Sequence, residues 1–240
     1  MAPAPAPSSP AATSFLPASC AATNAPDACY NLLLPYVDTF HGNLVRVARA
    51  AAAIAGARQR DFAGELGRLK LRGTGAGKVA DMTLADCFNE VSASNLFVNE
   101  TLGHIDNLVG RLGSKEDFDS QRVLAQELLY STESGLMQCV DWFHGAGEAA
   151  VSSPVGKEVI DGCTTVSAYV DIALMLVNAC HKVLSLYTAY AIKRFADWMS
   201  NDDTLPSCAT TASTRASAAC CCSIVSAHAG AVAVARHTCR

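Results

Sequence analysis

The chain has 240 residues, of which half are apolar and 17% are charged, and its formal net charge is −4. This share of apolar residues is sufficient to form a packed core. The basic residues are scattered along the chain, which argues against a nucleic-acid partner. Eleven cysteines is a high count. In the body of the chain they lack the close pairs and histidine neighbours of a zinc site. They therefore indicate disulfide bonds and a secreted, extracellular protein.

The N-terminal part divides into a leader and a cysteine-bounded loop. Residues 1–14 are rich in Pro, Ala and Ser and predict a disordered leader. They show neither the basic nor the apolar region of a signal peptide, so the expectation of secretion rests on the cysteines. Cys20 and Cys29 lie close enough in sequence to staple a local helical hairpin over about residues 15–31.

Four long segments with helical periodicity occupy about residues 32–190. Clusters of Gly, Ser and Pro separate them at 73–77, 110–114 and 145–154. The first segment runs from about Asn31 to Arg72 and is rich in alanine. The second has the clearest apolar seam, with alternating steps of four and three. Its members are Leu84, Phe88, Val91, Asn95, Val98, Leu102, Ile105, Val109 and Leu112.

The remaining two segments complete a bundle. The third repeats the seam weakly from Phe118 to Phe143, and the fourth repeats it clearly from Val159 to Tyr187. Short connections make neighbouring helices antiparallel. The sequence therefore predicts an all-α fold, an up-down-up-down four-helix bundle of about residues 32–190 behind a short α-hairpin. No β-strand alternation competes with this prediction.

The C-terminal part loses the helical periodicity. Residues 191–240 are dominated by Ala, Ser, Thr and Cys, which predicts a low-complexity, disordered tail. The apolar run from Ile172 to Val177 is bounded by Asp171 and Asn178. We therefore expect no membrane span.

Positions about the predicted turns restrict which cysteines can pair. In an antiparallel hairpin, residues equidistant from the turn lie at the same height, and the midpoint of Cys87 and Cys139 is Gly113. The midpoint of Cys139 and Cys163 falls in the next turn. Cys139 thus has two candidate partners, and spacing leaves both open. Cys163 and Cys180 also fit as small apolar residues of the last seam.

Catalytic and metal-binding motifs find little support. The glycine-rich stretch 73–78 lacks the Gly-x4-Gly-Lys-Ser/Thr pattern of a phosphate loop. Asp141, His144 and Glu148 share a helical face, but a solvated helix end explains them better than a metal site. There is no HExxH motif, and no Ser/His/Asp constellation can be assembled from spacing. We therefore expect neither an enzyme nor a bound metal or cofactor.

One modification signal is present. Asn99-Glu100-Thr101 is an N-glycosylation sequon. Asn99 adjoins Val98 of the apolar seam, so we expect it to be partly exposed and predict it as a glycosylation site.

Three blocks of sequence carry an ordered set of four cysteines. They are CAATNAPDAC from Cys20 to Cys29, LADC ending at Cys87, and CVDWF starting at Cys139. This set resembles the plant invertase and pectin methylesterase inhibitor family over residues 15 to about 188. The first block matches that family's opening Cys, Thr, Pro and Cys. The others match the start of its second bundle helix and its fourth cysteine, which is followed by an acidic residue and Phe.

The resemblance implies a fold and a function. It implies an α-hairpin stapled by Cys20–Cys29 and a bundle whose second and third helices are joined by Cys87–Cys139. It also implies an inhibitor that binds a pectin methylesterase or an acid invertase in the apoplast, in a 1:1 complex that occludes the active-site cleft. The Pro-Lys-Phe motif of some invertase inhibitors is replaced by SKEDF at 114–118, which favours a pectin methylesterase as the target.

Two further points follow from the resemblance. FADWMS at 195–200 resembles the segment after the inhibitor-like pro-region of long pectin methylesterases, so an orphaned pro-region is an alternative. Val91 stands where family members often carry Tyr. Polar positions of the second and third helices are the candidate enzyme contacts, namely Glu90, Ser94, Glu127 and Glu133.

Overall fold

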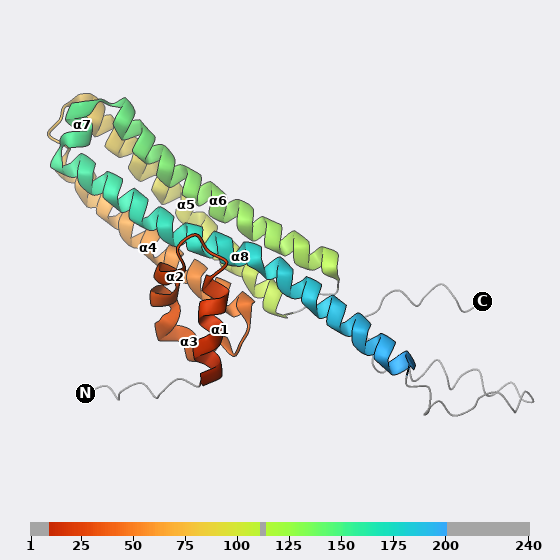
Figure 1. Cartoon of the computed structure of the whole chain (residues 1–240). Helices are drawn as coiled ribbons and strands as arrows, with labels where there is room; N and C mark the ends of the chain where they lie inside the picture. Colours follow the sequence, from red (N-terminus) through yellow and green to blue (C-terminus); the bar gives the residue numbers. More distant parts are fainter. Residues whose placement is uncertain (1–9, 111–113, 201–240) are drawn as a thin grey trace, which may run out of the picture. The chain divides into compact units, whose positions relative to one another are not determined.

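The computed structural model of the chain describes residues 10–110 and 114–200, with side chains over 14–109 and 114–181. These ranges contain helices and turns and no strand, so the predicted all-α class is confirmed. The described helices are α1 (Pro10–Cys20), α2 (Pro26–Leu33), the 3₁₀ helix η1 (Leu34–Tyr36), α3 (Val37–Phe40), α4 (Leu44–Arg72), α5 (Lys78–Gly110), α6 (Lys115–Gly145), α7 (Glu148–Ser152) and α8 (Pro154–Ser200). Figure 1 labels the α-helices.

The chain divides into two compact units. One comprises residues 1–112 and 116–183, and the other comprises 113–115 and 184–240. The bundle and the N-terminal hairpin belong to the first unit. Within the second, the described part is 114–115 and the continuation of α8 to Ser200.

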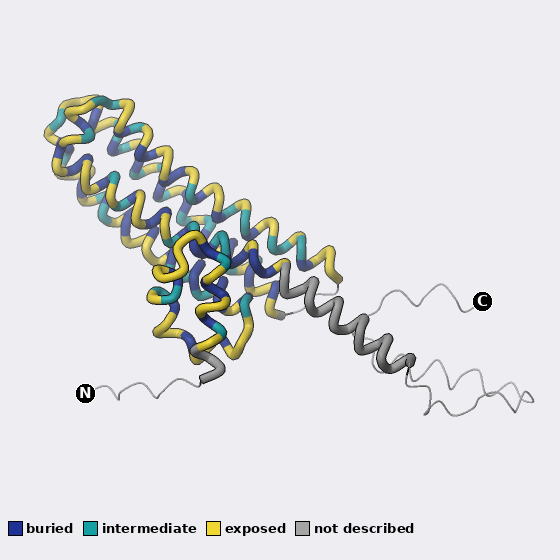
Figure 2. Tube along the Cα trace, viewed as in Figure 1, coloured by how far each residue is buried: buried dark blue, intermediate teal, exposed yellow. Residues whose placement is uncertain are grey.

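The four long helices α4, α5, α6 and α8 form the predicted bundle. Each packs antiparallel against its neighbour in the order α4, α5, α6, α8 and back to α4, which is the up-down-up-down arrangement. Links between neighbours include the Arg49–Asp106 ion pair, the Cys87–Cys139 disulfide, the Glu133–Ser167 hydrogen bond and the stacking of Arg58 over Tyr169. Figure 2 shows the buried stripes of the helices turned toward one another.

The predicted first helix, Asn31 to Arg72, is wrong in its first third. The structure interrupts it at His41 and Gly42, whose φ angles are 48° and 69°, in the left-handed region that ends a helix. Asn43 then begins α4, because its side-chain oxygen accepts hydrogen bonds from the backbone N–H groups of Val45 and Arg46. The N-terminal part is therefore a separate hairpin, α1 with α2, followed by η1 and α3.

Two boundaries differ from the expected domains. Helix α1 begins at Pro10, so residues 10–14 of the predicted leader are helical. Helix α8 continues to Ser200, so residues 191–200 of the predicted tail are helical as well. The rest of the predicted leader and tail, 1–9 and 201–240, lies outside the described residues.

Helix α8 supplies much of the core. Its start is set by Ser153, whose hydroxyl accepts a hydrogen bond from the N–H of Gly156, and by Pro154 at the first helical position. By length and composition the stretch Pro154–His181 meets the requirements of a membrane span, and 56% of its most apolar window is buried inside the structure. A core helix of a bundle has the same composition.

Candidate functional site

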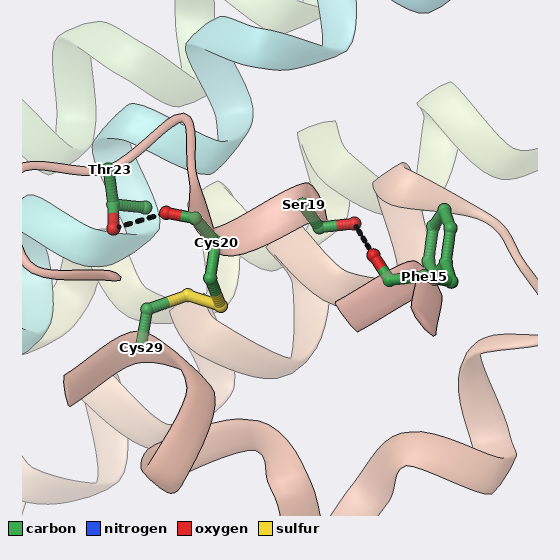
Figure 3. The surroundings of a disulfide bond; sticks show 5 residues. All are labelled: Phe15, Ser19, Cys20, Thr23 and Cys29. Atoms are coloured by element: carbon green, nitrogen blue, oxygen red, sulfur yellow. Dashed lines mark hydrogen bonds between the residues drawn. A yellow bond between two sulfur atoms is a disulfide. The ribbon is translucent and has the colours of Figure 1, made fainter. Parts of the chain in front are cut away.

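The first disulfide staples the N-terminal hairpin. Cys20 ends α1 and Cys29 lies in α2, with their Cα atoms 5.6 Å apart and both side chains buried. Figure 3 shows the local support: the Thr23 hydroxyl donates to the Cys20 carbonyl oxygen at 2.8 Å, and the Ser19 hydroxyl donates to that of Phe15 at 3.0 Å. The bridge and these bonds hold the chain reversal between the two helices.

The second disulfide joins α5 to α6. Cys87 and Cys139 are fully buried, with their Cα atoms 5.1 Å apart. This is the pairing that the family resemblance implies, and the rival partner, Cys163, is a free thiol. The bridge sets the relative height of the two helices, so every exposed side chain on one is held at a defined level beside the other.

The two free thiols among the described residues are unreactive groups of the core. Cys163 and Cys180 are fully buried on α8, and this burial raises the pKa of each thiol to about 12. Because the thiolate is the reactive form, neither is available as a nucleophile near neutral pH. Among the described residues, no group of three His, Cys, Asp or Glu side chains is arranged to hold a metal ion.

The four predicted contact residues occupy different environments. Glu127 is exposed on α6. Glu90 is half-buried on α5, with its carboxylate against Gly135 of α6. Glu133 is half-buried and faces α8, where it bonds the Ser167 hydroxyl. Of the four residues, only Glu127 is exposed.

The predicted position of Ser94 on a polar face is corrected by the structure. Its side chain is 4% exposed, accepts a hydrogen bond from Gln59 Nε2 at 2.7 Å and donates to the Val91 carbonyl oxygen. The predicted seam is offset because α5 packs against α4 on one flank and α6 on the other. The buried residues of α5 are Ala80, Leu84, Cys87, Val91, Ser94, Val98, Thr101, Ile105 and Leu108.

Large apolar side chains that remain exposed gather on α5 and α6. Among the described residues, eight of the eleven exposed large apolar side chains lie on these two helices, and α8 has none. We define the α5/α6 surface by four of these exposed side chains, Leu96 of α5 and Val123, Tyr130 and Met137 of α6. Leu96 and Tyr130 are 77% and 66% exposed. This surface is the candidate functional site.

The α5/α6 surface has a defined geometry. Val123, Tyr130 and Met137 follow at steps of seven, about two helical turns, and so form one stripe along α6. Leu96 lies nine residues after Cys87, and Tyr130 lies nine before Cys139, so the antiparallel pairing puts them at the same height. The sequence carried one signal for these residues. They are large and apolar, yet they lie outside the apolar seam, at positions where a solvated helix face usually carries polar residues.

The predicted glycosylation site lies on another flank of α5. Asn99 is exposed, whereas Thr101 of the sequon is 3% exposed. Asn99 precedes Asp106 by seven residues, and Asp106 pairs with Arg49 of α4. A glycan on Asn99 would therefore stand at the α4 edge of α5, leaving the α6 edge free, and its presence stays a prediction.

Burial changes the pKa of the Glu133 carboxyl. Desolvation raises the pKa of this carboxyl above its ordinary value, and the nearby Asp171 carboxylate raises it further, while the Ser167 hydrogen bond lowers it. A raised folded-state pKa means that the charged form is disfavoured in the folded protein. The contribution of Glu133 to stability is therefore largest at acid pH, and it is lost as the pH rises through the folded-state pKa.

Replacing Glu133 by Gln tests this consequence. We expect Glu133→Gln to be more stable than the parent at pH 7, by less than ~1 kcal/mol because the group is partly solvated. This gain in stability should vanish near pH 4. Urea unfolding of the variant and the parent at pH 4 and at pH 7 measures the difference. Glu127→Gln is the matched control, since it removes an exposed carboxylate from the same helix. A gain that is equal at the two pH values would contradict the assignment.

The fold and the surface together define a class of protein. It is a disulfide-stapled helical bundle that exposes large apolar side chains on α5 and α6 and, over the described residues, contains no assembled metal site. The sequence model of the plant invertase/pectin methylesterase inhibitor family matches residues 14–176, about two thirds of the chain. The chain belongs to this family, whose members are inhibitors and are typically extracellular. No curated protein and no solved structure matches it.

Proposed function

We propose that this chain is a secreted inhibitor of a cell-wall pectin methylesterase and that the α5/α6 surface docks against the active-site cleft of the enzyme in a 1:1 complex. The observation that carries the proposal is the concentration of exposed Leu96, Tyr130 and their neighbours on two disulfide-linked helices. Exposed apolar side chains of this size mark interaction surfaces when they gather in one place. Tyr in particular is enriched among the residues that dominate binding energy.

Preorganisation supports the same proposal. The Cys87–Cys139 bridge and the buried Gln59–Ser94 hydrogen bond hold α5 against α6 and α4 before any partner arrives. A rigid surface loses little conformational entropy on binding, so more of the contact energy appears as affinity. The exposed Glu127 carboxylate lies three residues from Tyr130 and supplies a polar rim. The choice of a pectin methylesterase over an invertase rests on the missing Pro-Lys-Phe motif.

Inhibition assays with matched variants test the proposal. Purified pectin methylesterase and acid invertase are titrated side by side with the oxidised protein, and we expect loss of esterase activity. Leu96→Asp should raise the inhibition constant tenfold or more, because it puts a charge in the centre of the interface, and Tyr130→Ala should act in the same direction. Leu71→Asp is the control, since Leu71 is 91% exposed but lies in the last turn of α4; we expect a change of less than about twofold there.

The other outcomes are informative. Loss of invertase activity alone would move the target to that enzyme. Inhibition that is equally sensitive to the changes at Leu96 and Leu71 would place the contact elsewhere on the bundle. An oxidised, folded protein that leaves both enzymes active would contradict the proposal and favour the orphaned pro-region.

A further inference from the structure

A hollow of about 620 Å³ lies on the other flank of α5, where η1 and α3 meet α4. Its lining includes Tyr36, Arg46, Arg49, Ala53, Ala57 and Asp106. The hollow lies between α4 and α5, and none of its lining residues belongs to the α5/α6 surface. The two are therefore distinct. Its size suits a small ring-shaped ligand or a short oligomer of rings.

The charges around the hollow favour an anion. The Arg46 guanidinium makes one hydrogen bond, to the Thr39 carbonyl oxygen at 3.4 Å, which is long for a charged donor. Among the described residues, no carboxylate lies within ion-pair distance of Arg46. Arg46 also stands in the first turn of α4, which carries no acidic residue, so the helix dipole adds to the positive potential.

The rest of the lining offers neutral polar groups and a flat apolar wall. Arg49 and Asp106 form a two-bond ion pair, with Nη2 and Oδ2 3.0 Å apart, and both side chains are about half exposed. The pair therefore presents N–H donors and carboxylate acceptors without net charge. Tyr36 is 46% exposed and offers an aromatic face. Ala53 and Ala57 carry no branched side chain, so a ring can lie close along α4.

We propose that this hollow binds a carboxylated sugar, one or more uronate rings of an acidic oligosaccharide. The sugar carboxylate pairs with Arg46, which can hold it through two parallel N–H donors. The ring hydroxyls exchange hydrogen bonds with the Arg49–Asp106 pair, and the apolar C–H face of the ring stacks on Tyr36. The site would hold the protein on an acidic polysaccharide while the α5/α6 surface stays free.

Calorimetric titration of the full, oxidised chain tests this site without any enzyme, so its result is independent of the inhibition assays. The probe is a trimer of galacturonic acid, and the matched ligand is its fully methyl-esterified form, which keeps the rings but loses the charges. We expect a dissociation constant on the order of 1 mM or tighter for the acid trimer and much weaker binding of the ester. Added salt should weaken the binding.

Two variants and one control locate the site. Arg46→Gln should weaken binding of the acid trimer about tenfold, the loss of one charge-assisted pair. Tyr36→Leu should weaken it severalfold by removing the stacking face. Arg60→Gln makes the same charge change at an exposed position farther along α4 and should leave binding unchanged. Absence of saturable binding at about 10 mM trimer, equal binding of the ester, or equal weakening by Arg60→Gln would overturn the proposal.

Discussion

Removing the Cys87–Cys139 bridge should cost about 4 kcal/mol of unfolding free energy, because its sequence separation is 52 residues and the opened chain gains the corresponding loop entropy. The double variant Cys87→Ala/Cys139→Ala keeps both positions apolar within a fully buried site. Urea unfolding of the oxidised proteins, followed by far-UV circular dichroism, measures the difference. Against a typical stability of about 5–15 kcal/mol, this is a large share.

A second cysteine variant separates the bridge from the loss of buried sulfur. Cys163→Ala removes a fully buried thiol that forms no bridge, so its cost of ~1 kcal/mol reports the small cavity alone. Dithiothreitol should destabilise the parent more than Cys87→Ala/Cys139→Ala, because it opens both described bridges in the parent and only Cys20–Cys29 in the double variant. A double variant within 1 kcal/mol of Cys163→Ala would show that packing of α5 on α6, rather than the bridge, carries the stability.

A methyl group at Gly162 should destabilise the bundle by about 1–3 kcal/mol, because α8 crosses α4 at this glycine. A Cβ built there would overlap the ring of Phe62, with Cζ and Cδ2 both at 2.8 Å, and that ring is 8% exposed. The ring cannot move without disturbing its own packing. Urea unfolding of Gly162→Ala measures the effect.

The control is another glycine, with the opposite expectation. Gly64 is exposed in α4, and a Cβ there meets no neighbouring atom within 4 Å, so Gly64→Ala should stabilise the protein by about 0.5–1 kcal/mol through helix propensity. In a Phe62→Leu background, Gly162→Ala should cost less, because the smaller side chain relieves the overlap. A stabilising Gly162→Ala would mean that α8 and α4 are farther apart here.

The local sequence pattern was sufficient to predict the all-α class and the order of the helices in the bundle. Periodicity over 30 residues or more identifies a long helix whatever surrounds it, and the glycine cluster at 73–77 ends one helix and begins the next. The family resemblance selected Cys87 as the partner of Cys139, where spacing alone left two partners. The break at His41 and Gly42 carried a weak signal, a single glycine before Asn43, and the apolar residues on both sides of it concealed the break.

Only the tertiary structure decided which flank of each helix is covered, because that depends on neighbours distant in sequence. The buried stripe of α5 keeps the alternating steps of the predicted seam, but every second member shifts by one residue, to Cys87, Ser94, Thr101 and Leu108. Ser94 is therefore buried, and it is hydrogen-bonded to Gln59 of the neighbouring helix α4. Glu133 owes its raised pKa first to burial against α8 and then to the nearby Asp171 carboxylate. The sequence by itself determined the helices and the cysteine framework, and the packing of four helices determined that Leu96 and Tyr130 are left to solvent at the same height.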